Sequence, residues 1–396
     1  MQTALNLQPA IAEIFVLAMV CVSLLAFLFA PRNKSNVAYF CVQLTLIIAF
    51  CISLYQYALP KQTAFYGMYI HDQVASLMKC MIYIISFFSF LYAKDYINDR
   101  KISGGDYYVL GLLSVLGMMV LVSANDLLIL FLGLEILSIP LYAMVALQRN
   151  NSICSEAAMK YYITGALATG LLLYGLSILY GATNSIDIPK IMSVASQTPA
   201  SQQLILYFAL VFVLAGIMFK VGAAPFHMWA PDVYQGAPSS VTLFIGGAPK
   251  IAALGLIFRL LVDAMPSLSF EWGQLLIIVA VLSIGIGNVV AIIQSNLKRM
   301  LAYSSIAHMG YMTLGLIAAT PQGYSSALFY IFIYAIMSIA AFAVIILLSR
   351  SGFEAENIAD LKGLNSRSPW LAFMMLIIMF SMAGIPPTAG FFAKLG

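Results

Sequence analysis

Hydrophobic segments fill most of the chain, and each has about the length needed to cross a lipid bilayer. A membrane-spanning helix needs roughly 20 apolar residues, and on that measure the sequence predicts twelve spans joined by polar connections. The predicted spans cover residues 10–30, 36–58, 72–92, 107–123, 126–147, 157–181, 203–236, 239–263, 273–292, 299–320, 325–349 and 369–396. The pattern therefore predicts an all-α polytopic membrane protein.

Two of the predicted spans are interrupted. The seventh is too long for one straight crossing and contains Pro225 and Pro231, and the twelfth contains the run Gly384-Ile-Pro-Pro387. Proline leaves the carbonyl of the residue four positions earlier without a backbone donor, so Pro225 frees the carbonyl of Val221. We expect both helices to be discontinuous. Because the sequence ends within an apolar run just after Lys394, we also expect the last helix to be incomplete.

Composition supports a membrane protein and excludes several other classes. Of 396 residues, 62% are hydrophobic and only 9% are charged, against about 25% charged in an average soluble domain. The net charge of +4 is not gathered into a basic, aromatic-rich patch, so we expect no nucleic-acid partner. The five cysteines lack ligand spacing, and no nucleotide, haem or zinc-protease motif occurs. We expect this chain to bind neither a metal nor a cofactor.

Lysine and arginine are distributed unevenly among the connections. Connections after even-numbered spans carry Lys61 and Lys190 only. Connections after odd-numbered spans carry Arg32, Lys34, Lys94, Arg100, Lys101, Arg149, Lys298, Arg299, Arg350, Lys362 and Arg367. Because basic connections stay on the cytoplasmic side, the odd connections are predicted to be cytoplasmic, and the N-terminus is predicted to lie on the opposite side.

Six cations remain inside the predicted spans: Lys79, Lys160, Lys220, Lys250, Arg259 and Lys394. A lysine at the bilayer centre costs roughly 2.5–3.5 kcal/mol on insertion scales, so such a residue usually faces a protein interior or a water-filled cavity. Lys79 and Arg259 stand nearer the span ends, and we expect both to extend to the lipid headgroups. The other four are candidates for function.

Glu135 and Lys220 are the central candidates. Glu135 lies near the middle of the fifth span and is either a neutral structural hydrogen-bond donor or the partner of a lysine at similar depth. Lys220 precedes the Pro225 break, and broken helices beside a buried charge form ion sites in transporters. The alternative is a proline kink tolerated by packing, with Lys220 incidental. Lysine can release its proton, which arginine cannot, so a row of lysines suits proton transfer.

The combination of proline and lysine recurs along the chain. Lys250 follows Pro249 in the eighth span, and Lys394 follows the second break. Lys160 either influences Glu135 from an adjacent helix or lies at the membrane interface. We therefore predict a proton path that uses Glu135, Lys220, Lys250 and Lys394, with Lys160 in support.

Two histidines are further candidates. His227 lies within the seventh span and His308 within the tenth. Imidazole titrates near neutrality, so either residue is able to pass protons through water. The alternative for each is a structural histidine that serves only as a hydrogen-bond donor.

Four stretches of the chain resemble a known family. They are residues 125–140 (NDLLILFLGLEILSIP), 219–238 (FKVGAAPFHMWAPDVYQGAP), 294–311 (QSNLKRMLAYSSIAHMGY), and 360–364 with 384–394 (DLKGL and GIPPTAGFFAK). They resemble the antiporter-like membrane subunits of respiratory NADH:quinone oxidoreductase (complex I), of the subunit N type. The family has fourteen helices, so the resemblance implies that helices thirteen and fourteen are missing here.

The resemblance implies an architecture of two inverted five-helix repeats, with helices seven and twelve discontinuous. Residues 1–103 would form helices 1–3, residues 104–263 the first repeat (helices 4–8), and residues 264–396 an incomplete second repeat (helices 9–12). It also implies a bacterial cytoplasmic membrane, in preference to an organellar or thylakoid one, with the N-terminus in the periplasm.

The resemblance further implies a role for each matching residue. Glu135 corresponds to the family's acid on helix five, Lys220 to the central lysine on helix seven, Lys250 to the lysine on helix eight, and Lys394 to the outlet residue on helix twelve. NADH, FMN, iron–sulfur clusters and quinone would bind in partner subunits, and the partners would be other membrane subunits of complex I and lipid. The alternatives are a subunit of a multisubunit Na⁺/H⁺ antiporter, an autonomous cation/proton antiporter, or a purely structural subunit.

Overall fold

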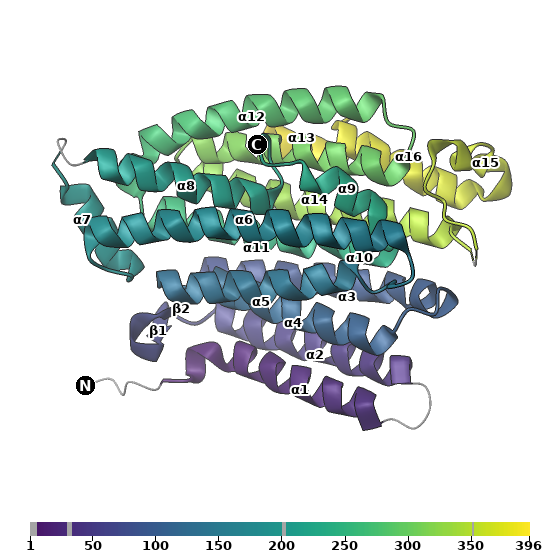
Figure 1. Ribbon diagram of the computed structural model, residues 1–396, viewed down its shortest axis with the longest axis horizontal. Helices are drawn as coiled ribbons and strands as arrows, with labels where there is room; N and C mark the ends of the chain where they lie inside the picture. Colours follow the sequence, from purple (N-terminus) through teal and green to yellow (C-terminus); the bar gives the residue numbers. More distant parts are fainter. Residues whose placement is uncertain (1–5, 30–33, 200–202, 351) are drawn as a thin grey trace.

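The computed structural model describes residues 6–29, 34–199, 203–350 and 352–396, and the chain is almost entirely helical within them. Figure 1 shows long helices lying side by side, with a small hairpin near the N-terminus at one edge of the bundle and α15 at the opposite edge. The predicted all-α membrane fold is therefore confirmed.

The first half of the chain contributes these elements: η1 (Gln8–Ala10), α1 (Ile11–Phe29), α2 (Lys34–Tyr57), β1 (Gln62–Ala64), η2 (Phe65–Gly67), β2 (Tyr69–His71), α3 (Gln73–Asp99), α4 (Gly104–Val122), α5 (Leu127–Val145), α6 (Ser152–Thr183), and α7 (Ile188–Gln197). The second half contributes α8 (Gln203–Val221), α9 (Trp229–Gly236), α10 (Ser239–Ile245), α11 (Ala248–Ile257), η4 (Phe258–Asp263), η5 (Pro266–Leu268), α12 (Ser269–Ile292), α13 (Leu297–Ile317), α14 (Pro321–Leu348), η6 (Ile358–Leu361), α15 (Leu364–Arg367), α16 (Pro369–Ala383) and α17 (Ala389–Leu395).

The helices follow the predicted spans closely. Ten helical stretches in the described chain are long and apolar enough to cross a membrane. The two remaining predicted spans coincide with α13 and with α16 followed by α17. The stretch Ser239–Asp263 is the most enclosed, because 89% of its apolar window is buried, against 28% for the stretch that contains α1. The centre of the bundle is therefore the eighth span, and α1 faces outward.

Both predicted breaks are present. The seventh span is divided into α8 and α9, which are separated by residues 222–228, and the twelfth into α16 and α17, separated by residues 384–388. The eighth predicted span, 239–263, contains a further break that was not predicted, because α10 ends at Ile245 and α11 begins at Ala248. A Cβ at Gly246 would lie 2.8 Å from Ser338 Oγ, and one at Gly247 would lie 2.8 Å from Ile85 Cγ2. Glycine at both positions lets α14 and α3 approach the break.

The antiparallel hairpin β1–β2 has no counterpart among the predicted elements. It is bonded to the connection between α4 and α5, where the Asn125 N–H donates to the Met68 carbonyl (2.9 Å) and the Ile70 N–H donates to the Ser123 carbonyl (2.9 Å). A rule that searches for 20-residue apolar runs does not detect strands of three residues, nor the short α7. The hairpin supports the N-terminal end of α5, where the Asp126 side chain caps the helix by accepting from the Leu128 N–H (2.7 Å).

Helices α4 and α5 are in close contact through two glycines. A Cβ on Gly117 would overlap the backbone of Leu137, and one on Gly133 would lie 2.7 Å from the backbone nitrogen of Leu121. The contact also allows the Ser114 hydroxyl to donate to the Leu137 carbonyl at 3.1 Å. Small residues at membrane helix interfaces let backbones approach in this way.

Replacing Gly117 with valine is therefore expected to separate α4 from α5 and to lower the yield of folded protein. Overpacking costs roughly 1–3 kcal/mol where neighbours adjust, and here the overlapping atoms are backbone. The folded fraction is measured by size-exclusion chromatography in detergent. The matched control is Gly170→Val on α6, since a Cβ there meets no atom within 4 Å. Equal yields for the two variants would contradict the packing interpretation.

Candidate functional site

Lys220 lies in the last turn of α8 and faces α5. Its ammonium donates to the hydroxyl of Ser138 at 2.9 Å and to that of Tyr142 at 3.3 Å. Glu135 precedes Ser138 by three residues and Tyr142 by seven, so all three lie on one face of α5. The fold thus brings Lys220 and Glu135 to the same interface, with hydroxyl groups beside the amine. Glu135 Oε1 is buried and has no hydrogen-bond partner in the described part of the chain.

Lys250 lies at the same break as Lys220, on α11. Its side chain is buried, and its ammonium donates to the carbonyl of Val221, the last residue of α8. The carbonyl that Pro225 was expected to free beside Lys220 is therefore occupied by Lys250. The ammonium also lies 5.6 Å from the ring centroid of Trp229, a distance at which a cation is attracted to the ring face.

The end of α8 is completed by two further features. The indole N–H of Trp229 donates to the Phe219 carbonyl at 2.9 Å. Gly222 has a φ of +77°, and a Cβ there would lie 3.0 Å from the Lys250 Nζ. Glycine at this position therefore makes the turn possible and leaves room for the amine. The side chains of Trp229 and Lys250 thus bind two carbonyls at the end of α8, those of Phe219 and Val221.

Lys394 repeats this arrangement at the second break. Its ammonium donates to the carbonyls of Met382 (2.9 Å) and Ala383 (3.1 Å), which end α16. It also lies 4.7 Å from the ring centroid of Tyr311 on α13. The carbonyl end of a helix carries partial negative charge, which favours a cation. Lys250 and Lys394 therefore each lie at the carbonyl end of a broken helix.

His308 is buried on α13 among aromatic residues. Its Nδ1 lies 2.6 Å from the Tyr330 hydroxyl, and its ring centroid lies 5.0 Å from that of Tyr334 and 6.2 Å from that of Tyr311. Because Tyr311 also contacts Lys394, a single tyrosine separates the histidine from the lysine. His227 lies in the break between α8 and α9, is buried, and its Nδ1 has no partner among the described residues.

Lys160 lies in a half-exposed ion-pair cluster whose acidic members in the described chain, Glu156 and Asp232, do not include Glu135. Its ammonium is 2.9 Å from Glu156 and 2.9 Å from Asp232, and 46% of its side chain is exposed. Asp232 on α9 also accepts from Arg299 Nη1 at 2.8 Å. Asp232 lies within the family-like stretch 219–238 but was not among the predicted site residues. Its sequence neighbours give no sign that two basic residues from other helices meet it.

The prediction that Lys79 extends to the headgroups is wrong. The side chain is fully buried, and its ammonium lies 2.5 Å from Glu13 Oε1 on α1 and donates to the Tyr69 hydroxyl at 2.9 Å. Tyr69 belongs to the hairpin that closes this end of the bundle. The Glu13 carboxylate and the Tyr69 hydroxyl bind the ammonium in place of solvent water.

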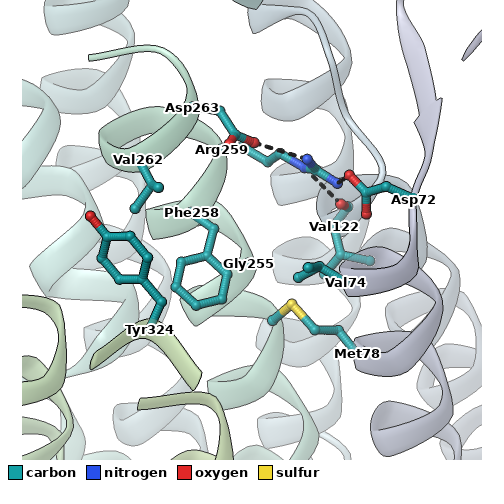
Figure 2. A pocket seen from close by; sticks show the side chains of 10 residues that line it. All are labelled: Asp72, Val74, Met78, Val122, Gly255, Phe258, Arg259, Val262, Asp263 and Tyr324. Carbon is teal, nitrogen blue, oxygen red and sulfur yellow. Dashed lines mark hydrogen bonds and ion pairs between the residues drawn. The ribbon is translucent and has the colours of Figure 1, made fainter. Parts of the chain in front are cut away.

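The corresponding prediction for Arg259 is also wrong. Figure 2 shows its guanidinium between the carboxylates of Asp72 and Asp263 at the edge of a cavity of about 170 Å³. The two ion pairs measure 2.8 and 2.9 Å, and Nε donates to the Val122 carbonyl at 3.0 Å. Arg259 therefore joins the N-terminus of α3, the C-terminus of α4 and η4.

No metal site accompanies these residues in the described ranges, since no three His, Cys, Asp or Glu side chains are grouped so that they could hold an ion. What the chain does present is a lysine amine at the carbonyl end of each of two broken helices, Lys250 buried and Lys394 exposed, within a bundle of membrane-length helices. Charged groups at discontinuous membrane helices are typical of ion-transporting membrane proteins.

Comparison with known proteins identifies the family. A family model described as "NADH:quinone oxidoreductase/Mrp antiporter, TM" matches residues 124–396. NADH-quinone oxidoreductase subunit N of Coxiella burnetii is 55% identical over 99% of this chain and 82% of its own length, and that of Thioalkalivibrio sulfidiphilus is 53% identical over 98% and 81%. The chain belongs to the NADH-quinone oxidoreductase subunit N family, as the resemblance of the four stretches predicted.

Solved structures agree with this assignment. A chain of respiratory complex I from Thermus thermophilus, solved with bound aureothin, is 30% identical with a TM-score of 0.80, and the match covers 97% of this chain and 81% of that one. A chain of the Mrp complex from Dietzia sp. shares the fold, with a TM-score of 0.82 at 20% identity over 99% of this chain and 74% of that one.

Proposed function

We propose that this protein is the proton-translocating membrane subunit of a bacterial NADH:quinone oxidoreductase. Membership of the subunit N family supports the host complex. The observation that carries the proton path is that Lys220 and Lys250 meet the broken end of α8 from two helices: Lys220 lies in the last turn of α8, and Lys250 on α11 binds the terminal carbonyl of α8. NADH, FMN, iron–sulfur clusters and quinone would bind in partner subunits.

Proton transfer would follow the charge state of each neighbour. In a low-dielectric interior, an amine keeps its proton more readily when a carboxylate is near and less readily when the carboxylate is neutral. When Glu135 is ionised, Lys220 would hold a proton; when Glu135 becomes neutral, Lys220 would pass its proton toward Lys250. Lys394 would release protons to the side of the N-terminus, with Lys160, His227 and His308 in support.

The proposal includes the division of the chain and its orientation. Residues 1–103 would form an N-terminal helical unit, 104–263 the first antiporter-like repeat and 264–396 the second. The uneven distribution of lysine and arginine supports placing the odd connections in the cytoplasm and the N-terminus in the periplasm.

Purification of the tagged chain from its native membrane tests the host complex. We expect it to copurify with subunits that carry flavin and iron–sulfur clusters, seen by absorbance and by electron paramagnetic resonance. Membrane vesicles are expected to acidify their lumen upon NADH addition, with sensitivity to a quinone-site inhibitor. Purification of the chain without flavin or iron, together with Na⁺-dependent proton exchange in liposomes, would overturn the proposal in favour of an antiporter.

A further inference from the structure

The segment 353–358, between α14 and α15, is attached to the connection between α12 and α13. The Leu297 N–H donates to the Glu356 carbonyl at 2.5 Å, and the Ile358 N–H donates to the Ser295 carbonyl at 3.0 Å. In Figure 1 this part of the chain lies toward the edge occupied by α15, opposite the hairpin. The segment carries two carboxylates, Glu354 and Glu356, that the proposed proton path does not use.

Glu354 binds the start of α10. Its Oε1 forms an ion pair with Arg100 at 2.9 Å and accepts from the Tyr96 hydroxyl at 2.9 Å. Its Oε2 accepts from the Ser239 hydroxyl at 3.4 Å, and the Ser239 backbone N–H donates to the Tyr96 oxygen at 3.2 Å. One carboxylate thus connects α3 to the first residue of α10.

Glu356 acts through a buried lysine on Ala237, the residue that follows α9. Lys298 is only 1% exposed, although its position in a basic connection predicted a solvated charge. Its ammonium donates to the Ala237 carbonyl at 2.7 Å and forms an ion pair with Glu356 at 3.0 Å. An enclosed ammonium without a carboxylate is costly, so Glu356 keeps Lys298 in place.

Together the two carboxylates hold both sides of Pro238. We refer to residues 237–239 as the elbow, because they join the end of α9 to the start of α10. The elbow connects α9, which contacts Lys250 through Trp229, to α10, which precedes the helix that carries Lys250. Trp229, which lies over the Lys250 ammonium, begins α9, and Lys250 is the third residue of α11, which follows α10 after a break of two residues. A displaced elbow would therefore move both of them.

We propose that Glu354 and Glu356 are positioning residues of the proton path. They hold the elbow from the side of the basic connections and so keep Lys250 against the Val221 carbonyl. The inference rests on the proposed function and adds a role for residues outside the proposed row of lysines. It also connects the segment between α14 and α15 to the first helix break through the elbow and α9.

The test uses the whole complex in membrane vesicles and compares protons pumped per NADH oxidised. The double variant Glu354→Gln/Glu356→Gln is expected to lower this ratio by at least about twofold. The single variant Glu356→Gln should also lower it, whereas Glu356→Asp, which keeps the carboxylate, should retain most of the wild-type ratio. Asp360→Asn is the matched control, because the Asp360 carboxylate binds only the backbone N–H of Asn357 (2.9 Å) within the described chain and an amide oxygen keeps that bond. Assembly is measured in parallel by the NADH oxidation rate with an uncoupler.

An apolar replacement separates positioning from stability. Lys298→Met with Glu356→Leu removes both charges without leaving either unpaired, a change that buried ion pairs often tolerate. If the pair positions the elbow, the assembled double variant pumps less, since nothing then binds the Ala237 carbonyl. A wild-type ratio in this variant overturns the inference. Lys220→Ala, run alongside, tests the proposed function separately: full pumping there would overturn that proposal instead.

Discussion

Replacing Lys220 with alanine is expected to remove most of the NADH-driven proton pumping while leaving the complex assembled. The ammonium donates to Ser138 and Tyr142 at the face of α5 that carries Glu135. Without the amine, a proton would have to cross from Glu135 to Lys250 with no intermediate carrier. We expect about a tenfold loss, equivalent to roughly 1.4 kcal/mol in the limiting transfer.

Lys220→Arg distinguishes a proton carrier from a fixed charge. Arginine keeps the positive charge and the donors but does not release its proton, so pumping should remain impaired. Fluorescence quenching of a pH-sensitive dye in inverted vesicles measures the rate, and oxidation of NADH with an uncoupler reports assembly. Lys190→Ala is the control, since the Lys190 side chain is 72% exposed and its one ion pair among the described residues is with Asp187. Pumping at wild-type stoichiometry in both Lys220 variants would contradict the assignment.

Replacing Lys79 with methionine is expected to destabilise the protein strongly. The change leaves Glu13 buried without its cation, and breaking a buried ion pair costs roughly 3–5 kcal/mol. The carboxylate is 8% exposed and no second donor among the described residues meets it. The thermal unfolding midpoint in detergent should fall, and the amount of folded chain should fall with it.

The double variant Glu13→Leu/Lys79→Met tests whether the loss of stability comes from the unpaired carboxylate. It removes both charges together, so the midpoint should recover most of the loss, as expected when a buried pair is replaced by apolar side chains. Lys190→Ala, which breaks the surface ion pair with Asp187, is again the control, because loss of a surface ion pair changes the unfolding midpoint little. If Lys79→Met leaves the midpoint at its wild-type value, the ion pair does not support the N-terminal helices.

Much of the fold could be predicted because hydropathy acts locally. In a membrane every backbone group must be bonded within its own helix, so a run of about 20 apolar residues has few structural alternatives. Proline adds a second local rule, which is why the breaks after Val221 and Ala383 were foreseen. The break between α10 and α11 was not predicted from proline positions, because it lies at Gly246 and Gly247, where other helices approach closely.

The candidate residues could be chosen from the sequence, but their partners could not. A charged residue inside an apolar run is recognised from its sequence neighbours alone. Four candidates were identified in this way: Glu135, Lys220, Lys250 and Lys394. Lys298 was missed because it stands in a polar connection, where nothing nearby in the chain indicates that Ala237 and another segment enclose it. Exposure depends on which segments meet, and that is a property of the assembled bundle.

The sequence by itself determined where the apolar spans lie, where proline breaks two of them and which charged residues stand inside the spans, because each follows from residues adjacent in the chain. Only the tertiary structure decided that the Val221 carbonyl binds Lys250 and not Lys220, and that Lys79 pairs with Glu13. The physical reason is that a buried charge takes whichever complementary group the packing of distant helices brings within reach, and no local pattern records that choice.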